Sequence, residues 1–357
     1  MGTAPLVDVG RCHPILVRTG SDAPPMQSTI LVTHPRSRLP DYFGEDALSR
    51  LRGIARVRLN DRDDDLSGTG LIAAAQGCAM VIAYRQTPVD AVTFAALPDL
   101  VAVVRCAVDI RAIDVAAASR HGILVTQASA GFMAAVSEWV IAVMIDLSRH
   151  ISACVAQYRA CGAAAAVMGR ELRGAVLGVI GYGQISRYLC PLAQALGMRV
   201  LVHDPHARVQ AVDIAQTGFE QLLAQADYVV CLAPSNAQTE NLMNTRAFAT
   251  MKRGAYFINA ARGDLVDDAA LLHALDSGQL GGAALDVGRA ADQMPTLALA
   301  KHPQVIATPH IGGLTPPATR HQALETVAQC ADILRGRVPT GAVNATDATR
   351  WLRLAQA

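Results

Sequence analysis

The sequence predicts an α/β protein of two domains, each built on a parallel β-sheet covered by helices. Its 357 residues suffice for two domains of about 100–200 residues each. Short, almost continuous apolar segments alternate with helical stretches in two series along the chain, as is typical of strands buried on both faces. The second series contains six such segments and opens on a glycine-rich turn, which favours a doubly wound dinucleotide-binding sheet.

The composition excludes several classes of protein. Hydrophobic residues make up 52% of the chain and charged residues 17%, which does not fit a disordered protein. The 31 basic and 30 acidic residues nearly cancel, so no net field would attract nucleic acid or an anionic membrane. The longest apolar run, residues 139–145, is a third of the roughly 20 residues that a membrane span needs. The N-terminal residues also lack a secretory signal, and we expect a cytoplasmic protein without nucleic-acid or membrane partners.

The cysteines are scattered without any Cys-x-x-Cys pair, at positions 12, 78, 106, 154, 161, 190, 231 and 330. Most lie in apolar segments, where a free thiol behaves as a small hydrophobic side chain. We expect reduced cysteines that pack in the core, with neither disulfides nor a metal site.

The first series begins at Ser28, because residues 1–27 show no sustained hydrophobic period and are predicted to be an N-terminal extension. Its predicted strands are residues 28–35, 79–84, 100–104 and 122–127, and residues 44–53 are predicted to be helical. A long helix is then predicted over about residues 131–160. That helix is apolar around most of its circumference, so we expect either the core of this chain or a partner chain to bury it.

The second series contains strands predicted at residues 175–181, 198–204, 226–233, 255–260, 282–287 and 305–310. Six parallel strands is the count of a doubly wound dinucleotide-binding sheet. A further helix is predicted over about residues 316–336, followed by the tail VPTGAVN. This last stretch is not needed by the six strands and could return to the first domain.

The segment GVIGYGQIS, residues 178–186, follows a predicted strand and opens a helix, as a phosphate-binding turn does. Gly181 allows the tight turn, and Gly183 lets backbone amides approach a pyrophosphate. Ser186 replaces the third glycine and is small enough to keep the helix close to the strand. Asp204 lies 21 residues after Gly183, where its carboxylate would accept hydrogen bonds from the ribose and favour NAD over NADP. Nearby basic side chains could weaken that preference, namely His203, His206 and Arg208.

Three further residues lie at or just after the carboxyl ends of predicted strands of the second series, where parallel sheets bind ligands: Arg262, Asp286 and His310. An arginine, a carboxylate and a histidine at one sheet edge suit hydride transfer involving a 2-keto acid. Arg262 would clamp the substrate carboxylate and polarise the carbonyl. His310 would exchange the hydroxyl proton, with a carboxylate holding its ring.

With these motifs the chain resembles the D-isomer-specific 2-hydroxyacid dehydrogenases, especially their D-3-phosphoglycerate dehydrogenase branch, over about residues 30–344. The resemblance rests on the GYGQIS turn with Asp204 and on the segments FINAARGDLVDDAAL, ALDV and TPHIGG. It implies a Rossmann-type doubly wound sheet inserted into a smaller flavodoxin-like α/β substrate domain. The implied parts are a substrate domain of residues 28–128 and 315–345, an NAD-binding domain of residues 129–314 and a tail of residues 346–357. It also implies a homodimer with the helix near residues 131–148 in the interface.

The resemblance assigns roles to individual residues. The family's catalytic arginine and histidine fall on Arg262 and His310, and its nicotinamide-amide aspartate falls on Asp286. Arg262 and His310 are also expected to contact the cofactor. Further cofactor contacts fall on Gln184, Ile185, Ala233, Pro234, Ala260, Ala261, Gly312 and Gly313. The substrate-binding positions are Arg85, Ala107, Val108 and Arg262.

Two departures from the family's pattern bear on the chemistry. The family's DVFExEP is here DVGRAADQMP, so the catalytic glutamate is missing. One inserted residue would give its role to Asp292, which lies 18 residues before His310, with Gln293 as the competing partner of the histidine. The family's substrate loop R-x-G-V-G-V-D-N-I-D is here RCAVDIRAID, and Asp109 near a bound anion is unfavourable unless Arg105 or Arg111 neutralises it.

The sequence therefore predicts an NAD-dependent oxidoreductase acting on the CH–OH group of a small D-2-hydroxy acid. Its candidate substrates are 3-phosphoglycerate, glycerate or hydroxypyruvate, and glyoxylate. The alternative from another class is a dinucleotide-sensing protein with little or no turnover, which the altered substrate loop favours. A formate-type dehydrogenase is a third interpretation, which would need Gln293 beside the histidine.

Overall fold

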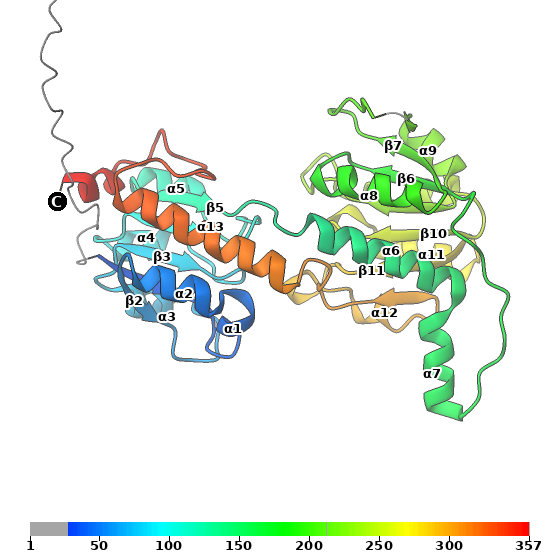
Figure 1. Ribbon diagram of the computed structural model, residues 1–357, viewed down its shortest axis with the longest axis horizontal. Helices are drawn as coiled ribbons and strands as arrows, with labels where there is room; N and C mark the ends of the chain where they lie inside the picture. Colours follow the sequence, from blue (N-terminus) through cyan, green and yellow to red (C-terminus); the bar gives the residue numbers. More distant parts are fainter. Residues whose placement is uncertain (1–27, 212, 357) are drawn as a thin grey trace, which may run out of the picture.

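The computed structural model describes residues 28–211 and 213–356 and shows two parallel β-sheets, each covered by helices on both faces (Figure 1). The predicted extension, residues 1–27, and Cys12 lie outside the described residues. The sheets form two lobes. Helix α13 (Pro316–Leu334) lies along the first lobe and helix α6 (Met133–Arg149) along the second, and each has one end near the junction between them. The predicted α/β class with two parallel sheets is confirmed.

The first sheet has the strand order β2-β1-β3-β4-β5. Its strands are β1 (Thr29–Val32), β2 (Arg56–Leu59), β3 (Met80–Ala83), β4 (Ala102–Arg105) and β5 (Leu124–Gln127). This is the flavodoxin-like order. Its helices are α1 (Leu39–Tyr42), α2 (Gly44–Arg52), α3 (Gly68–Ala75), α4 (Ala91–Ala96) and α5 (Val115–Arg120). The strand β2 is missing from the prediction because its sequence RVRL alternates charge with apolar residues at the sheet edge instead of forming an apolar run.

The second sheet has the strand order β12-β11-β10-β9-β6-β7-β8. Its strands are β6 (Val176–Ile180), β7 (Arg199–His203), β8 (Ile214–Gln216), β9 (Tyr228–Cys231), β10 (Ala255–Asn259), β11 (Leu280–Leu285) and β12 (Val305–Ala307). The prediction of six strands is wrong by one. The strand β8 is only three residues long, and it lies partly exposed at the sheet edge, so it carries no apolar run. The first six strands then have the order 3-2-1-4-5-6 of the doubly wound fold, with β12 added beyond them.

The helices of the second lobe include α8 (Gln184–Ala195), α9 (Phe219–Gln225), α10 (Thr245–Thr250), α11 (Asp268–Asp276) and α12 (Leu297–Ala300). Short 3-10 turns follow β10 and β11 at η1 (Gly263–Leu265) and η2 (Ala291–Gln293). A third such turn, η3 (Arg350–Gln356), ends the described chain.

The C-terminal helix returns to the first sheet. Ala323, Cys330 and Ile333 of α13 are fully buried in the core of that sheet. After α13, the amide of Val343 donates to the carbonyl of Val125 at 3.0 Å. The packing continues beyond residue 345, because Trp351 is 5% exposed within the same core. The expectation that a tail begins at residue 346 is therefore wrong for the described part of that segment.

The helix predicted over residues 131–160 is broken at His150, which adopts a left-handed conformation with φ of 55°. The first half, α6, buries Val140 and Met144 against the second sheet, whereas the second half, α7 (Ile151–Cys161), has no buried residue. Of the helices in the described ranges, no single one is long and apolar enough to cross a membrane. The pair α6 and α7 meets the length and composition of a span, but the two helices are bent by 61° at their junction.

Five cysteines are buried as predicted for packed thiols: Cys78, Cys106, Cys190, Cys231 and Cys330. Burial raises the pKa of Cys106 to about 11 and that of Cys231 to about 12, so these thiols stay protonated at neutral pH. Cys154 and Cys161 lie on α7 and are more accessible. All seven described cysteines are unbonded.

Candidate active site

A cavity of about 430 Å³ lies between the two lobes, at the carboxyl ends of strands from both sheets. Parallel sheets bind ligands at this edge, because the loops that follow the strands meet there. Both predicted catalytic positions with described side chains, Arg262 and His310, line the cavity. The predicted substrate positions Arg85, Ala107 and Val108 line it from the first sheet.

The glycine-rich turn has the geometry of a phosphate-binding site. Gly181 has φ of +92°, and a Cβ there would lie 2.8 Å from the Cα of Ala233, so only glycine fits. Gly183 precedes the first turn of α8, and a Cβ there would point into open space. Ser186 is fully buried, and its hydroxyl donates to the carbonyl of Gly181 at 2.5 Å. The turn and the helix N-terminus fit a dinucleotide pyrophosphate, with Gln184 and Ile185 in the first helical turn.

Asp204 lies just after β7, beside this turn. Its Oδ2 accepts from the amide of Tyr182 at 2.7 Å, and its Oδ1 accepts from the amides of His206 and Ala207 at 2.8 Å. Burial would raise the pKa of Asp204, but these backbone hydrogen bonds lower it below its ordinary value. A carboxylate has about four acceptor sites, so Asp204 can also accept from a ribose hydroxyl. His203 is turned to the carbonyl of Thr217, with its Nδ1 3.1 Å from that oxygen.

Asp286 holds the loop that carries His310. The carboxylate of Asp286 is 3% exposed and accepts from the Thr308 hydroxyl at 2.6 Å and from the Gly312 amide at 2.7 Å. A Cβ at Gly312 would lie 2.8 Å from Oδ2 of Asp286, so glycine permits this close approach. The backbone carbonyl of Asp286 accepts from the His310 amide at 3.0 Å. These bonds stabilise His310 in a left-handed conformation with φ of 56°, which costs a non-glycine residue about 1–2 kcal/mol.

The imidazole of His310 contacts the first sheet through Arg85. Nη2 of Arg85 lies 3.1 Å from Nδ1 of His310. A guanidinium has only donors, so Nδ1 must accept and Nε2 carries the proton of the neutral ring. Asp292 lies in η2, but its side chain lies outside the described part of the chain, and its pairing with His310 stays a prediction.

Gln293 does not hold the histidine in this structure. Its Nε2 donates to Oδ2 of Asp109 at 3.2 Å, and its buried Oε1 has no hydrogen-bond partner. The choice between Asp292 and Gln293 as the histidine's partner stays a prediction. Gln293 joins a polar network that links the two lobes.

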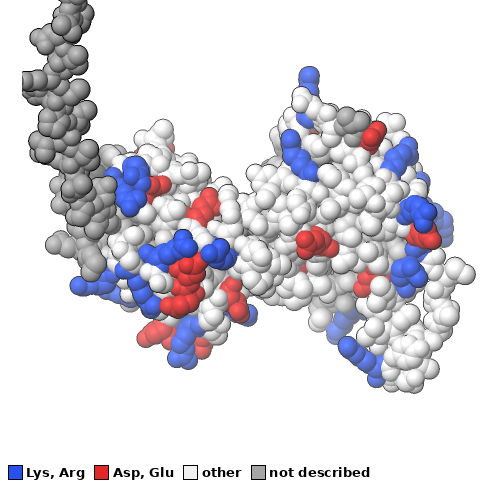
Figure 2. All heavy atoms as spheres, viewed as in Figure 1, with Lys and Arg blue, Asp and Glu red and all other residues white. Residues whose placement is uncertain are grey.

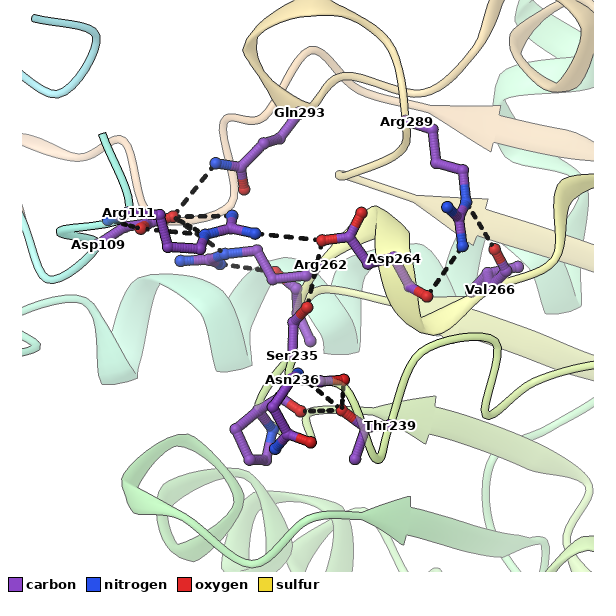
Figure 3. A network of polar contacts seen from close by, with 12 residues as sticks. Asp109, Arg111, Ser235, Asn236, Thr239, Arg262, Asp264, Val266, Arg289 and Gln293 are labelled. Atoms are coloured by element: carbon purple, nitrogen blue, oxygen red, sulfur yellow. Dashed lines mark hydrogen bonds and ion pairs between the residues drawn. The ribbon is translucent and has the colours of Figure 1, made fainter. Parts of the chain in front are cut away.

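This network is centred on Asp109 and Arg111 (Figure 3). Nε of Arg262 lies 3.5 Å from Oδ2 of Asp109, and Nη1 of Arg262 donates to the carbonyl of Ala261 at 2.6 Å. Arg111 lies between two carboxylates, with its Nη2 2.9 Å from Asp109 and its Nη1 3.1 Å from Asp264. Burial would raise the pKa of Asp109, but the hydrogen bonds from Arg111 and the charges of Arg262 and Arg111 hold it well below its ordinary value.

Of the two arginines considered for neutralising Asp109, Arg111 bonds to its carboxylate, whereas Arg105 donates to its backbone carbonyl and acts on the carboxylate only through its charge. Arg105 is 2% exposed, and its guanidinium donates to the backbone carbonyls of Tyr84 at 2.6 Å, Asp109 at 2.9 Å and Arg85. Burial lowers the pKa of Arg105 to about 10, which leaves it charged at neutral pH. Its role is to fix the loops after β3 and β4 that form one wall of the cavity.

The remaining cofactor positions lie on the second-sheet side of the cleft. Ala233 and Pro234 follow β9, Ala260 and Ala261 follow β10, and Gly312 and Gly313 follow His310. Sequence reasoning missed the site roles of Asp264 and of the aromatic residues Tyr42, Tyr84 and Phe132 that line the cavity. Asp109 and Arg111 were detectable because both fall in the loop that departs from the family's pattern, whereas nothing local marks the aromatic residues.

The comparisons with known proteins agree with this geometry. The family described as "D-isomer specific 2-hydroxyacid dehydrogenase, NAD binding domain" matches residues 141–312. The chain is 34% identical over 322 residues to D-3-phosphoglycerate dehydrogenase 3, chloroplastic, of Arabidopsis thaliana, covering 89% of this chain and 53% of that protein. It is 33% identical over 306 residues to the human D-3-phosphoglycerate dehydrogenase, covering 82% of this chain and 57% of that protein. The chain thus spans about half the length of these curated relatives.

Among solved structures, the TT0316 protein from Thermus thermophilus is similar with a TM-score of 0.80 and 29% identity, covering 88% of this chain and 99% of that one. D-2-hydroxyisocaproate dehydrogenase has the same fold, with a TM-score of 0.78 at 24% identity, covering 89% of this chain and 99% of that one. The matched segment includes the glycine turn, Asp204, Arg262, Asp286 and His310. Residues 141–312 therefore form an NAD-binding domain of the D-isomer-specific 2-hydroxyacid dehydrogenase family.

Proposed function

We propose that this protein is an NAD-dependent dehydrogenase that interconverts a small D-2-hydroxy acid and its 2-keto acid. The observation that carries the proposal is that Arg262 and His310 line one cavity together with Arg85, at the sheet edge where the glycine-rich turn also lies. We also propose that residues 129–314 are the inserted domain, between residues 28–128 and the returning residues 315–345. The packing of α13 on the first sheet supports this arrangement.

Arg262 binds the carboxylate of the acid. Its guanidinium is half-buried, and a bidentate contact to a carboxylate would orient the keto carbon and polarise the carbonyl. When bound, the nicotinamide exchanges a hydride with that carbon. Burial lowers the pKa of Arg262, while the charge of Asp109 opposes this effect, and the guanidinium keeps its charge at neutral pH.

His310 moves the proton at the substrate oxygen. In the neutral ring Nδ1 accepts from Arg85, and the proton is on Nε2. To act as an acid during reduction, the ring must first bind a second proton at Nδ1, which requires Arg85 to release that nitrogen. We propose that Asp292 then accepts from Nδ1 and stabilises the imidazolium.

The test is oxidation of NADH and NADPH by purified protein with glyoxylate, pyruvate, hydroxypyruvate, phosphohydroxypyruvate and one branched keto acid. We expect NADH-dependent turnover with at least one acid, which His310→Ala abolishes. Tight NADH binding without any turnover would contradict the dehydrogenase.

One observation favours a second function, a dinucleotide-sensing protein with little turnover. The carboxylate of Asp109 already lies beside Arg262, where a substrate carboxylate would bind. In that case NADH would bind and change the conformation or assembly of the protein, and no keto acid would be reduced. The same assay separates the two functions.

We further propose a homodimer formed through α6 and α7. Apolar side chains on these helices and the following segment are exposed, namely Ile145, Ile151, Val155, Tyr158 and Met168. Met168 is 94% exposed, and α7 projects away from the second lobe (Figure 1). Charged side chains are sparse on the visible face of α6, whereas both signs are interspersed over the first lobe (Figure 2). An exposed apolar surface of this kind fits a second copy of the chain.

We also place the protein in the cytoplasm, which the unbonded, mostly buried described cysteines support.

A further inference from the structure

The active-site cavity contains a buried carboxylate that the proposed reaction does not use. The side chain of Asp109 is 20% exposed and lies on the cavity wall, 3.5 Å from the Arg262 guanidinium. Five donor contacts surround it: the amide, Nε and Nη2 of Arg111, Nε2 of Gln293 and Nε of Arg262. Such dense pairing keeps Asp109 ionised, so its negative charge is a fixed feature of the substrate site.

These ion pairs also offset positive charge that would otherwise attract a second anionic group on the substrate. Arg111 is shared between Asp109 and Asp264, so two carboxylates offset its charge. Arg105 lines the cavity, but its Nε, Nη1 and Nη2 already donate to backbone carbonyls. Nη2 of Arg85, which also lines the cavity, lies 3.1 Å from Nδ1 of His310. Arg262 divides its charge between Asp109 and the substrate carboxylate. A phosphoryl group or second carboxylate would therefore meet a paired arginine and a like charge in a partly dehydrated cavity.

Part of the wall contributed by the first lobe and the junction is apolar or aromatic, beside the charged Arg85, Asp109 and Arg111. It includes Tyr42, Tyr84, Phe132, Val136 and Leu314. Tyr42 and Tyr84 are in edge contact, with ring centroids 5.4 Å apart. His34 behind Tyr84 is 1% exposed, and burial followed by the charge of Arg105 lowers its pKa to about 3, so it adds no cation at neutral pH. These surfaces fit a hydrocarbon or aromatic substituent.

We propose that Asp109 makes this site selective for 2-keto acids whose only negative charge is the carboxylate and whose substituent is apolar or aromatic. This inference rests on the proposed function and names its substrate class. Acids with a phosphoryl group or a second carboxylate are disfavoured, although the curated relatives are named for a phosphorylated acid.

The experiment compares two acids of similar length, 4-methyl-2-oxopentanoate and 2-oxoglutarate, which differ in a terminal isopropyl group or carboxylate. Phenylpyruvate and phosphohydroxypyruvate form the second pair. With the full chain and NADH we expect kcat/KM to be at least tenfold higher for the singly charged member of each pair. Asp109→Asn keeps the size of the side chain and removes its charge. We expect it to reduce that preference at least fivefold, mainly by lowering KM for the more highly charged acid of each pair.

The control is Asp332→Asn, which removes a carboxylate paired with Arg337 near the end of α13 and leaves the preference unchanged. Equilibrium binding of the same acids to the NADH complex, by calorimetry, gives a second readout that is independent of turnover. A wild-type preference for the more highly charged acids, or an unchanged preference in folded Asp109→Asn, would overturn the inference and leave the dehydrogenase intact. If none of the four acids is bound or turned over, both the selectivity inference and the proposed dehydrogenase function are overturned.

Discussion

Nη2 of Arg85, just beyond β3 of the first sheet, lies 3.1 Å from Nδ1 of His310, which follows β12 of the second sheet. The two lobes thus meet at the ring proposed to move the proton. Because the guanidinium can only donate, this contact fixes the tautomer of the neutral histidine. Closure of the cleft and the protonation state of His310 are therefore coupled through one hydrogen bond.

Replacing Arg85 tests this coupling. We expect Arg85→Gln to lower kcat/KM about 10- to 100-fold, because Arg85 lines the cavity at a predicted substrate-binding position and a hydrogen bond from a charged group contributes about 1.5–3 kcal/mol. Arg85→Lys, which keeps the charge, should recover part of the loss. Arg337→Gln, at an exposed ion pair, is the control and should match the wild type. Steady-state kinetics that show no change in Arg85→Gln would exclude a role for this contact.

Removing the imidazole tests the proton transfer directly. We expect His310→Ala to lower kcat about 10²- to 10⁴-fold, the usual contribution of a positioned acid or base. The affinity for NADH should change little, because the glycine turn and Asp204 lie on other loops. Measuring NADH binding by fluorescence alongside the kinetics separates the two effects, and equal losses in both would point to a disturbed fold.

Asp204 is expected to set the choice of cofactor. In Asp204→Ala the amides of Tyr182, His206 and Ala207 lose their acceptor, and the charge that repels a 2′-phosphate disappears. We expect a higher KM for NADH and at least a tenfold smaller preference for NADH over NADPH. Asp227→Asn, which alters a carboxylate paired with Lys252 elsewhere in the second lobe, is the comparison. An unchanged preference in Asp204→Ala would contradict the assigned role.

Part of the loss of folding stability at low pH should arise from His34. Burial lowers its pKa from 6.5 to about 3 in the folded chain, so between these values the unfolded chain binds more protons. The stabilising effect is therefore complete above pH 6.5 and is lost as the pH falls towards 3, by at most about 1.4 kcal/mol per pH unit. We expect His34→Phe to flatten the fall in urea midpoint between pH 7 and pH 5, with exposed His206→Gln as the control. If the urea midpoints of His34→Phe and His206→Gln fell in parallel as the pH is lowered, the assignment of acid sensitivity to His34 would be refuted.

The exposed apolar side chains of α7 predict that the protein assembles as a homodimer. Val155 and Tyr158 of α7 are 41% and 61% exposed. If a second copy covers them, Val155→Glu combined with Tyr158→Glu should convert a dimer into a monomer in sedimentation experiments. A monomeric wild-type protein at micromolar concentration would contradict the proposed homodimer. As the control, Asp63→Lys on the first lobe should leave the mass of the assembly, measured by sedimentation, unchanged.

The strands buried on both faces were predictable because continuous apolar runs such as AMVIAY have few alternative structures. The edge strands β2 and β8 were not, since one side of each carries polar residues and the tertiary context alone makes them strands. The break at His150 was also hidden, because a left-handed histidine inside an apolar helical pattern leaves no periodic signal.

The candidate site, like the fold, was only partly predictable from the sequence. Arg262 and His310 were predictable from their positions after strands, and the structure brings both to one cavity. The contacts of Asp109 with Gln293 and Arg262 could not be deduced, because they join residues 184 and about 150 positions apart across two lobes. Side-chain pairing across a cleft depends on how the domains close, which no local pattern encodes.

The return of α13 has implications for the order in which the chain folds. Strands β1 to β5 leave the ribosome first, but Ala323, Cys330 and Ile333, which cover one face of that sheet, are synthesised about 200 residues later. Thr126 and Gln329, whose side chains bond at 2.8 Å, are 203 residues apart in sequence. The second lobe has its strands in one continuous stretch and can fold while the first sheet is still incomplete. Nascent protein therefore exposes an apolar sheet face until the last helix emerges, and that interval is when chaperones would protect it most.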